Sequence, residues 1–595
     1  MRRWINNCIS SHAQCRLDNR QQLPKFTRIL DVGIDDQIKS VKLRDKDEVP
    51  IQAMYMTLSH CWGGLQITHL TADSYKTFRS GINLDTLPQT FQDAVCLTHN
   101  LGVRYLWIDS LCIIQDSEED WRLQAAEMGN IYRYSWCNIA ATGAKDGRDG
   151  LFRFLERIPA SVESLAVTIP DFGQPKFDDL EPDDPISIDS SKWLGMPHPR
   201  KDVPWMGMPP GHYRCVNRYL WYQNVSDSPL ATRAWVVQER LLAPRVLHFG
   251  RRQIFWECNE LKSCELYPNG LPEEADLLST AELKCKEITS GYPYPTNLAT
   301  PQDWNDTGPC PRILQSWDDV VKVYSKAKLT FESDKLVAIA GLAKTYAERI
   351  HAPYLAGLWG VHLPRQLLWA IRQPTEFPAK RRAPTWSWAS VDGEVRNIVN
   401  AHDAVERRIA EILDFHVDGD MLGYTGELRL QARLIPCTLS YDPTANVTEQ
   451  CNPLVRGLEC AAFIKPDTLP SGSPQDTLLQ PQAERFFCAP IMIFYDTTEP
   501  TTPEVAGLVL QSTALKGVFR RFGAFRTDNA MDRDGDRHHN WVADDRAQPR
   551  KHTQFGRVFL MDVEDELAEV GEQFYLSYEM HPARGGFANF TFVVV

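Results

Sequence analysis

A tryptophan and a glutamate stand four positions apart in the segment RAWVVQERLL, which spans residues 233–242. On a helix, Trp235 and Glu239 would lie on one face, one turn apart, beside apolar side chains that face a core. A carboxylate fixed at the rim of a pocket can act as a general base or stabilise a positive charge that develops on a substrate. Glu239 is therefore a residue whose type and position could do chemistry.

Polar and aromatic residues at the ends of two strand-like segments are the candidate substrate contacts. The segments YMTLSHCWG (residues 55–63) and RYLWIDSLCIIQD (residues 104–116) each contain an apolar run typical of a buried strand. Ligands of open α/β sheets usually bind beyond the carboxyl ends of the parallel strands. There, Trp62 or Trp107 would stack on a flat ring of a ligand, and Asp109 would accept a hydrogen bond from a ligand hydroxyl. The candidate substrate-binding residues are Ser59, His60, Trp62, Asp109, Cys112, Gln115, Arg233 and Trp235.

Each of these candidates also has a purely structural interpretation. Tryptophans are more often core residues than ligand platforms, and Asp109 at a strand end can cap the following turn. His60 cannot form a nucleophile pair with its neighbour Cys61, because adjacent side chains on a strand point to opposite faces. It would form such a pair with Cys112 only if the fold brought these two residues together. Glu239 would have no catalytic role if it formed an ion pair on a helix surface with Arg233, Arg240 or Arg245.

The spacing of Cys8, His12 and Cys15 is the one metal-like pattern in the chain. Two thiolates and an imidazole suit zinc, but a structural tetrahedral site needs a fourth protein ligand, and none lies nearby in the sequence. Packing of an amphipathic helix against the rest of the protein explains the same residues. The sequence alone therefore defines no metal site and leaves these three residues as zinc candidates.

Strand-like and helix-like segments alternate around the candidate residues. Residues 54–58, 104–108 and 138–141 are short apolar runs, whereas residues 87–101 and 117–132 carry apolar side chains at helical spacing. This order predicts a parallel sheet with helices on its faces, and hence an α/β fold. After the helix that contains Glu239, the segments RVLHFG and QIFWEC, separated by the turn residues Arg251 and Arg252, predict a hairpin.

Four blocks in fixed order, YMTLSHCWG, LPQTFQDAV, RYLWIDSLCIIQD and RAWVVQERLL, closely resemble the heterokaryon incompatibility (HET) domain of filamentous fungi. That family is tied to non-self recognition and programmed cell death. HET domains look distantly similar to Toll/interleukin-1 receptor (TIR) domains, some of which cleave NAD+ with the glutamate of a W-C-x-x-E motif. Trp235 and Glu239 keep the spacing of that motif, while Val236 replaces its cysteine. The resemblance implies a TIR/Rossmann-like parallel-sheet domain, NAD+ as a possible substrate and Glu239 as the catalytic residue. In that case Glu239 would stabilise the positive charge on the ribose or orient its hydroxyls and the attacking nucleophile, Trp62 or Trp107 would stack on the base, and Asp109 would accept a hydrogen bond from a ribose hydroxyl.

The length of 595 residues predicts more than one domain. We expect a leader over residues 1–50 that packs on a HET domain over residues 51–260, which contains an irregular insertion at 153–227. A loop and a helical extension follow over residues 261–400, and a β-rich C-terminal domain covers residues 401–595. The helices expected in the extension span residues 317–324, 335–349 and 366–371.

Composition and motifs limit the functional classes. The net charge of −13 argues against nucleic acid as a partner, and no apolar run is long enough to span a membrane. The N-terminal segment lacks the apolar core of a signal peptide, which predicts an intracellular, cytoplasmic protein whose 15 cysteines are reduced. The glycine motifs of dinucleotide oxidoreductases and P-loop NTPases are absent.

Three functions remain open. The first is an incompatibility or cell-death effector that self-associates or binds other incompatibility proteins and hydrolyses NAD+ or binds another nucleotide or small molecule. The second is a non-enzymatic, self-associating signalling scaffold. The third is an enzyme recruited to a fungal secondary-metabolite pathway, which the long insertion and the aromatic residues near the predicted pocket would suit.

Overall fold

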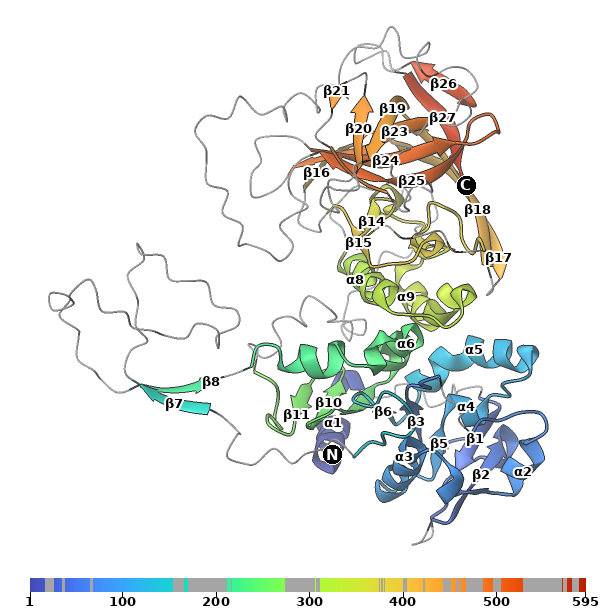
Figure 1. Cartoon of the computed structure of the whole chain (residues 1–595), viewed down its shortest axis with the longest axis vertical. Helices are drawn as coiled ribbons and strands as arrows, with labels where there is room; N and C mark the ends of the chain where they lie inside the picture. The colour runs from blue at the N-terminus through green and yellow to red at the C-terminus, as the bar shows by residue number, and fades with distance from the viewer. Residues whose placement is uncertain are drawn as a thin grey trace, which may run out of the picture.

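The computed structural model divides the chain into a lower sheet, a central helical layer and an upper β-rich sheet (Figure 1). Both sheets, described below, are built from residues far apart in the sequence. The structure describes residues 1–15, 26–34, 38–64, 68–152, 165–169, 211–215, 217–272, 305, 311–373, 375, 378, 380–399, 404–420, 423–441, 451–455, 458–459, 462–466, 485–495, 504–527, 570, 575–580 and 588–595.

Four parallel strands form the centre of the lower sheet. Their spatial order is β5-β3-β6-β9, so the chain first adds β5 on one side of β3 and then adds β6 and β9 on the other. Such a reversal of strand order leaves a crevice at the carboxyl ends of β3 and β6. These strands are β3 (Tyr55–Ser59), β5 (Tyr105–Trp107), β6 (Cys137–Ala140) and β9 (Arg245–Phe249).

Antiparallel strands extend both edges, so the nine-stranded sheet is mixed. The sequence predicts a parallel sheet, and the structure differs from that prediction at both edges. The physical reason is connection length, because short turns join neighbouring strands only in antiparallel pairs. The hairpin expected after the Glu239 helix is confirmed as the pair β9 and β10. The added strands are β1 (Arg28–Asp31), β2 (Ser40–Asp45) and β4 (Ile82–Asn83) at one edge, and β10 (Ile254–Cys258) and β11 (Lys262–Cys264) at the other.

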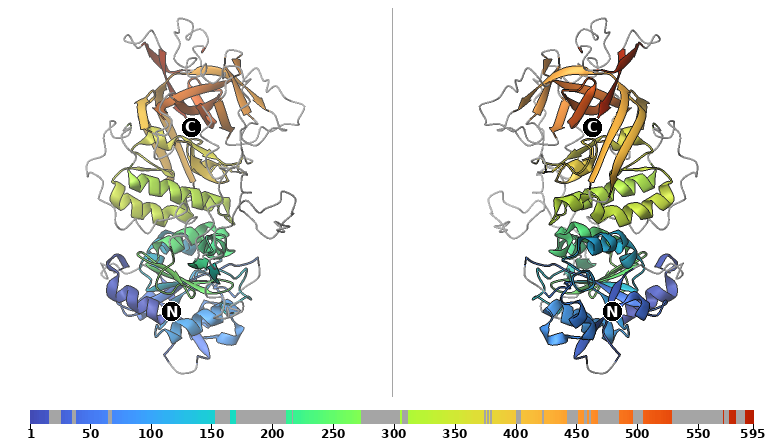
Figure 2. Two further views of the ribbon diagram at one scale, coloured as in Figure 1. Left: turned by 90° about the vertical axis from the view of Figure 1, so that its left-hand side faces the viewer. Right: turned by 90° about the vertical axis from the view of Figure 1, so that its right-hand side faces the viewer.

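Helices cover the two faces of this sheet. Tyr55 donates a hydrogen bond from β3 to the Ile131 carbonyl of α5, which places α5 over one face. His60 packs edge-on against Phe91 of α3, which places α3 over the other face. Helix α6 lies on the α5 face, between the sheet and the helical extension (Figure 2). These helices are α1 (Arg2–Ser11), α2 (Tyr75–Ser80), α3 (Gln89–Asn100), α4 (Asp109–Cys112), α5 (Glu118–Arg133) and α6 (Ala234–Leu242).

The predicted insertion at 153–227 is described only in part. Strand β7 (Leu165–Ile169) pairs antiparallel with β8 (Gly211–Cys215), so the insertion contains some regular structure. Residues 217–227 are also described and include a short π-helical turn at Tyr222–Ser226. The rest of the insertion lies outside the described residues.

The helical extension packs onto the α5 and α6 face. Two of the three helices expected there are present, as α8 (Arg312–Lys326) and α9 (Ala340–Ile350). The helix expected at 366–371 is wrong, because this segment contains only the end of α10 (Leu363–Gln366) and then β14 (Trp369–Ile371). Strand β14 pairs with β15 (Val395–Asn397), and β12 (Tyr354–Leu355) pairs with β13 (Leu358–Trp359).

The C-terminal region is β-rich, as expected from its sequence. Buried arginines attach it to the extension: Arg521 donates hydrogen bonds to the carbonyls of Leu367 and Trp369 and stacks on the Trp369 ring, 3.5 Å from its centroid. The sequence RVFLMDV at residues 557–563 also predicts a strand, but it lies outside the described residues. The strands are β16 (Ala404–Arg408), β17 (Glu411–Asp420), β18 (Gly423–Ala432), β19 (Ile435–Tyr441), β20 (Cys451–Val455), β21 (Leu458–Glu459), β22 (Ala462–Pro466), β23 (Phe486–Tyr495), β24 (Glu504–Ser512), β25 (Val518–Thr527), β26 (Ser577–Met580) and β27 (Ala588–Val594).

A pair of glycines sets the distance between α5 and α9. A Cβ atom added at Gly129 would lie 2.6 Å from the Cα of Gly341, and one added at Gly341 would lie 2.7 Å from the Cα of Gly129. Because the obstacle is backbone, neither contact can be relieved by a side-chain rotation. The two helices therefore approach closely only because both positions are glycine.

Overpacking costs about 1 to 3 kcal/mol, and the higher helix propensity of alanine returns about 1 kcal/mol, so we expect Gly129→Ala to destabilise the protein by up to about 2 kcal/mol. Urea denaturation measures the change. Leu123→Ala in the same helix is the control, because the Leu123 side chain is 58% exposed. A Gly129→Ala protein as stable as wild type would show that α5 and α9 do not need this approach.

Candidate active site

Glu239 lies on the inner side of α6 and faces the sheet. It is 3% exposed, although it belongs to a helix that also carries the charged side chain of Arg240. Ser59, at the end of β3, donates a hydrogen bond from its hydroxyl to the Glu239 carboxylate. The segments that contain Ser59 and Glu239 therefore converge in the fold.

A chain of hydrogen bonds holds Ser59 in this position. Thr57 donates to the side-chain oxygen of Asn138 over 3.0 Å, and the Asn138 amide donates to the Ser59 hydroxyl, also over 3.0 Å. Thr57 and Ser59 point to the same side of β3 because side chains alternate along a strand. The hydroxyl of Tyr132 on α5 interacts with the same carboxylate. Two neighbouring strands and two helices thus position Glu239.

Burial raises the pKa of Glu239 to about 7. Removal from water disfavours the charged carboxylate, and nearby Asp109 adds to this effect. The positive charge of Arg233 and the hydrogen bonds with Ser59 and Tyr132 oppose it without cancelling it. Glu239 is therefore able to gain or lose a proton near neutral pH, as a general acid or base must.

A cavity of about 280 Å³ lies over the carboxyl ends of β3 and β6, at the point where the strand order reverses. Ser59 and Asn138 line its floor, and Val236 and Val237 of α6 form one wall. Among the described residues, the lining includes Ser59 but not Glu239, so Ser59 connects the buried carboxylate to the cavity. The cavity is also lined by basic residues, namely Arg240, Lys262, Lys326 and Lys328.

A second buried polar chain reaches the same cavity. His248 is 2% exposed, and its ring contacts the Thr142 hydroxyl at 3.2 Å and the Glu257 carboxylate at 3.1 Å. Arg240 forms two hydrogen bonds with Glu257, at 2.8 and 3.1 Å. Sequence reasoning missed these residues. The signal was a histidine and a glutamate within the otherwise apolar strands RVLHF and IFWEC.

His60, Trp62 and Asp109 form a cluster on the other side of β3. His60 Nδ1 lies 3.6 Å from Asp109, and the Trp62 indole donates to the same carboxylate over 3.2 Å. Burial lowers the pKa of His60 to about 4, so its ring is neutral at pH 7. Arg233 donates a hydrogen bond to the His60 carbonyl, which ties the start of α6 to this cluster. These four candidates are brought near one another, but none lines the cavity.

Two further candidates have structural contacts instead. Cys112 is fully buried, burial raises its pKa to about 12, and its carbonyl accepts a hydrogen bond from Arg28. The Gln115 amide donates to the carbonyls of Asp109 and Ile113 and so closes the turn after α4. Neither environment suits a nucleophile or a substrate contact.

Trp235 also lies away from the cavity. Its indole donates to Asp334 over 3.4 Å and packs edge-on against Trp121 of α5. Trp235 and Glu239 stand one turn apart on α6, but they contact different neighbours. Glu239 contacts Ser59 of the sheet, whereas Trp235 contacts α5 and the helical extension. Trp107, the other proposed stacking residue, is fully buried in the core against Tyr132.

The comparisons with known proteins agree with the four sequence blocks. Residues 55–239 match the family model described as heterokaryon incompatibility protein (HET). The chain thus contains a HET domain at residues 55–239. The matched range begins with β3 and ends at Glu239, so it includes the buried carboxylate and Ser59. No curated protein and no solved structure matches the chain.

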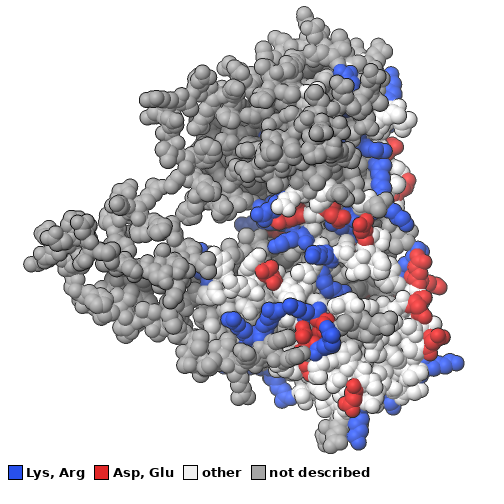
Figure 3. Space-filling view, viewed as in Figure 1, with Lys and Arg blue, Asp and Glu red and all other residues white. Residues whose placement is uncertain are grey.

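Two general expectations of the sequence bear on the molecular surface. Within the described part of the chain, no helix is long and apolar enough to cross a membrane. Basic and acidic side chains both occur across the visible described surface in Figure 3. The exclusion of nucleic acid as a partner stays a prediction.

Replacement of Glu239 by glutamine should change how stability depends on pH. The ordinary pKa of this carboxyl is 4.5, and burial raises it to about 7 in the folded state. The stability that protonation contributes is therefore full below pH 4.5 and is lost as the pH rises through about 7. Relative to wild type, Glu239→Gln should become more stable by about 3 kcal/mol between these limits, at about 1.4 kcal/mol per pKa unit.

Urea denaturation at several pH values measures this difference, and the contribution of His60 cancels because both proteins contain it. Glu119→Gln is the control, because Glu119 is exposed in the first turn of α5. A constant difference between wild type and Glu239→Gln from about pH 4.5 to about pH 7 would contradict the raised pKa.

Proposed function

We propose that the HET domain hydrolyses the nicotinamide glycosidic bond of NAD+, with Glu239 as the base and Ser59 as its link to the substrate. The observation that carries this proposal is a buried carboxyl whose pKa is about 7, hydrogen-bonded to a hydroxyl that lines a cavity. The resemblance of Trp235 and Glu239 to the TIR motif also favours Glu239 as the catalytic residue. The contacts of Trp235 with Asp334 leave the tryptophan a structural role.

The proposed reaction needs one base and one water molecule. The bond between C1′ of the ribose and the ring nitrogen breaks, and its electron pair neutralises the pyridinium as nicotinamide leaves. Water attacks C1′ and passes a proton to the Ser59 hydroxyl, which passes its own proton to the Glu239 carboxylate. The products are ADP-ribose, nicotinamide and one proton. The negative charge of ionised Glu239 also stabilises the positive charge that develops on the ribose.

The cavity has the size and charge for part of a dinucleotide. Its volume of about 280 Å³ is at the small end of ligand pockets and suits the nicotinamide riboside half. Lys326 and Lys328 lie exposed at its edge, where their ammonium groups would attract the pyrophosphate. The rest of the dinucleotide would then extend over this basic edge.

Nicotinamide release from NAD+ by the purified full chain tests the proposal. Glu239→Gln and Ser59→Ala should each lower kcat by at least about 100-fold, because general base catalysis contributes roughly that much. Glu119→Gln should retain wild-type activity. Circular dichroism and thermal unfolding check that the inactive variants are folded.

Two substrates separate binding from chemistry. Lys326→Ala with Lys328→Ala should raise KM for NAD+ several-fold and leave KM for nicotinamide riboside, which lacks the pyrophosphate, unchanged. Lys76→Ala is the control, because Lys76 is an exposed lysine on α2.

Two outcomes would overturn the enzymatic proposal and favour the non-enzymatic scaffold. One is that wild type releases no nicotinamide at high protein concentration, and the other is that Glu239→Gln releases as much as wild type.

A further inference from the structure

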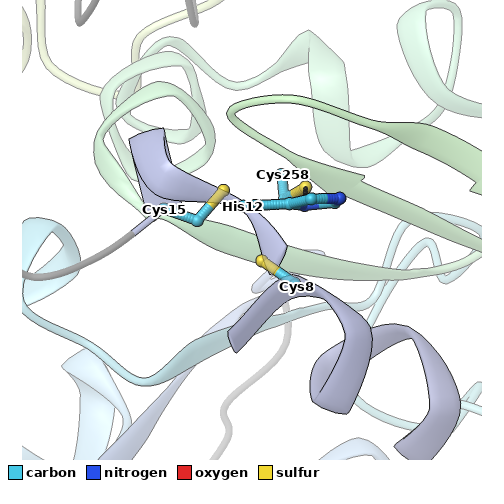
Figure 4. A group of neighbouring side chains, drawn as sticks. All are labelled: Cys8, His12, Cys15 and Cys258. Carbon is cyan, nitrogen blue, oxygen red and sulfur yellow. Dashed lines mark hydrogen bonds between the residues drawn. The ribbon is translucent and has the colours of Figure 1, made fainter. Parts of the chain in front are cut away.

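Four metal-ligating side chains meet on the face of the lower sheet opposite Glu239. Cys8, His12, Cys15 and Cys258 each offer one ligand atom, and these atoms all lie within 4.8 Å of one another. Figure 4 shows the three sulfur atoms and the imidazole ring gathered in one place. The three cysteines are buried and His12 is half-buried. The fourth ligand that the sequence pattern lacks is therefore supplied by Cys258.

Two elements distant in sequence build this cluster. Cys8 lies in α1, His12 is the C-cap of that helix, and Cys15 ends the short 3-10 turn that follows. Cys258 is the last residue of β10 and stands 246 positions after His12. A search for ligands close in sequence cannot find such a partner, which explains why the N-terminal pattern looks incomplete.

The geometry fits one tetrahedral ion. Zinc bonds of about 2.3 Å to sulfur and about 2.0 Å to nitrogen place neighbouring ligand atoms roughly 3.5 to 3.8 Å apart. His12 Nδ1 lies 3.3 Å from the Cys258 sulfur, and the limit of 4.8 Å for the whole set requires only a small contraction around an ion. Three thiolates and one imidazole are a common structural zinc set, and soft sulfur ligands favour zinc over magnesium or calcium.

Charge around the cluster also suits a bound cation. A divalent cation bound to cysteine sulfurs deprotonates the thiols. Three thiolates with Zn²⁺ leave one net negative charge, and the buried guanidinium of Arg245 donates to the Cys8 sulfur over 3.3 Å.

Arg245 also fixes the backbone around the cluster. It donates to the carbonyl of Cys15 over 2.9 Å and to that of Trp136 over 3.1 Å. The Asn259 amide, next to Cys258, donates to the Gln14 carbonyl over 2.7 Å. Partners that orient the ligands and balance their charge are typical of built metal sites.

We propose that Cys8, His12, Cys15 and Cys258 bind one structural zinc ion that fastens α1 to β10. All four positions of the tetrahedron are protein ligands, so no position is left for a substrate. The site is separate from the proposed glycosidase centre, because strand alternation places Cys258 and Glu257 on opposite faces of β10. Binding releases the thiol protons, and the ion is not consumed or reduced.

Metal analysis of the full chain, purified without chelators, tests this proposal. Inductively coupled plasma mass spectrometry should measure about one zinc ion per chain in wild type and almost none in Cys258→Ser. Cys264→Ser is the matched control, because Cys264 is also a buried cysteine, on the neighbouring strand β11, outside the cluster. Equal zinc content in wild type and Cys258→Ser would overturn the proposal.

A second measurement needs no variant. Replacement of the ion by Co²⁺ in wild type should give the visible spectrum of a tetrahedral site with an intense thiolate-to-cobalt charge-transfer band. Titration with zinc should abolish that spectrum at one equivalent per chain. A wild-type protein that binds no cobalt and shows a disulfide between two of these cysteines by non-reducing mass spectrometry would contradict the proposal and identify a redox pair instead.

Discussion

The burial of one carboxyl group between α6 and the sheet is the constraint on which the candidate site depends. Glu239 lies where water is excluded, so its charged form is stable only to the extent that Arg233, Ser59 and Tyr132 compensate the lost hydration. Ser59 is itself held by Asn138 of the neighbouring strand. A buried group of this kind is costly for stability, and an arrangement that keeps it titratable near neutral pH is typical of functional sites.

Alternation along the strands separates two kinds of chemistry. On β3, Ser59 faces α6 and the cavity, whereas His60 faces α3. On β10, Glu257 contacts Arg240 of α6, whereas Cys258 lies with the ligands from α1. The proposed catalytic centre and the proposed zinc site therefore occupy opposite faces of one sheet, and the pair β9 and β10 contributes to both.

The sequence predicted what depends on local pattern. The α5 helix follows from its capping serine and helical spacing, and the strand before Ser59 follows from its apolar run. Contacts between distant segments were harder to predict from the sequence. No local pattern indicates that Cys258 lies beside Cys8. The antiparallel edges of the sheet depend on which strands pair, and that is not decided by local pattern either. For Trp235, the four-residue spacing from Glu239 predicts a shared helix face but does not decide which neighbour each side chain contacts.

Infrared difference spectroscopy of wild type against Glu239→Gln tests the central claim most directly, because the C=O band of a protonated carboxyl reports the proton on Glu239 itself. We predict that a single carboxylic-acid band, absent from the variant, is present at acidic pH and titrates away with a midpoint of about 7. A band that disappears near the ordinary value of 4.5 would show that Glu239 is ionised throughout the neutral range, and would contradict the account.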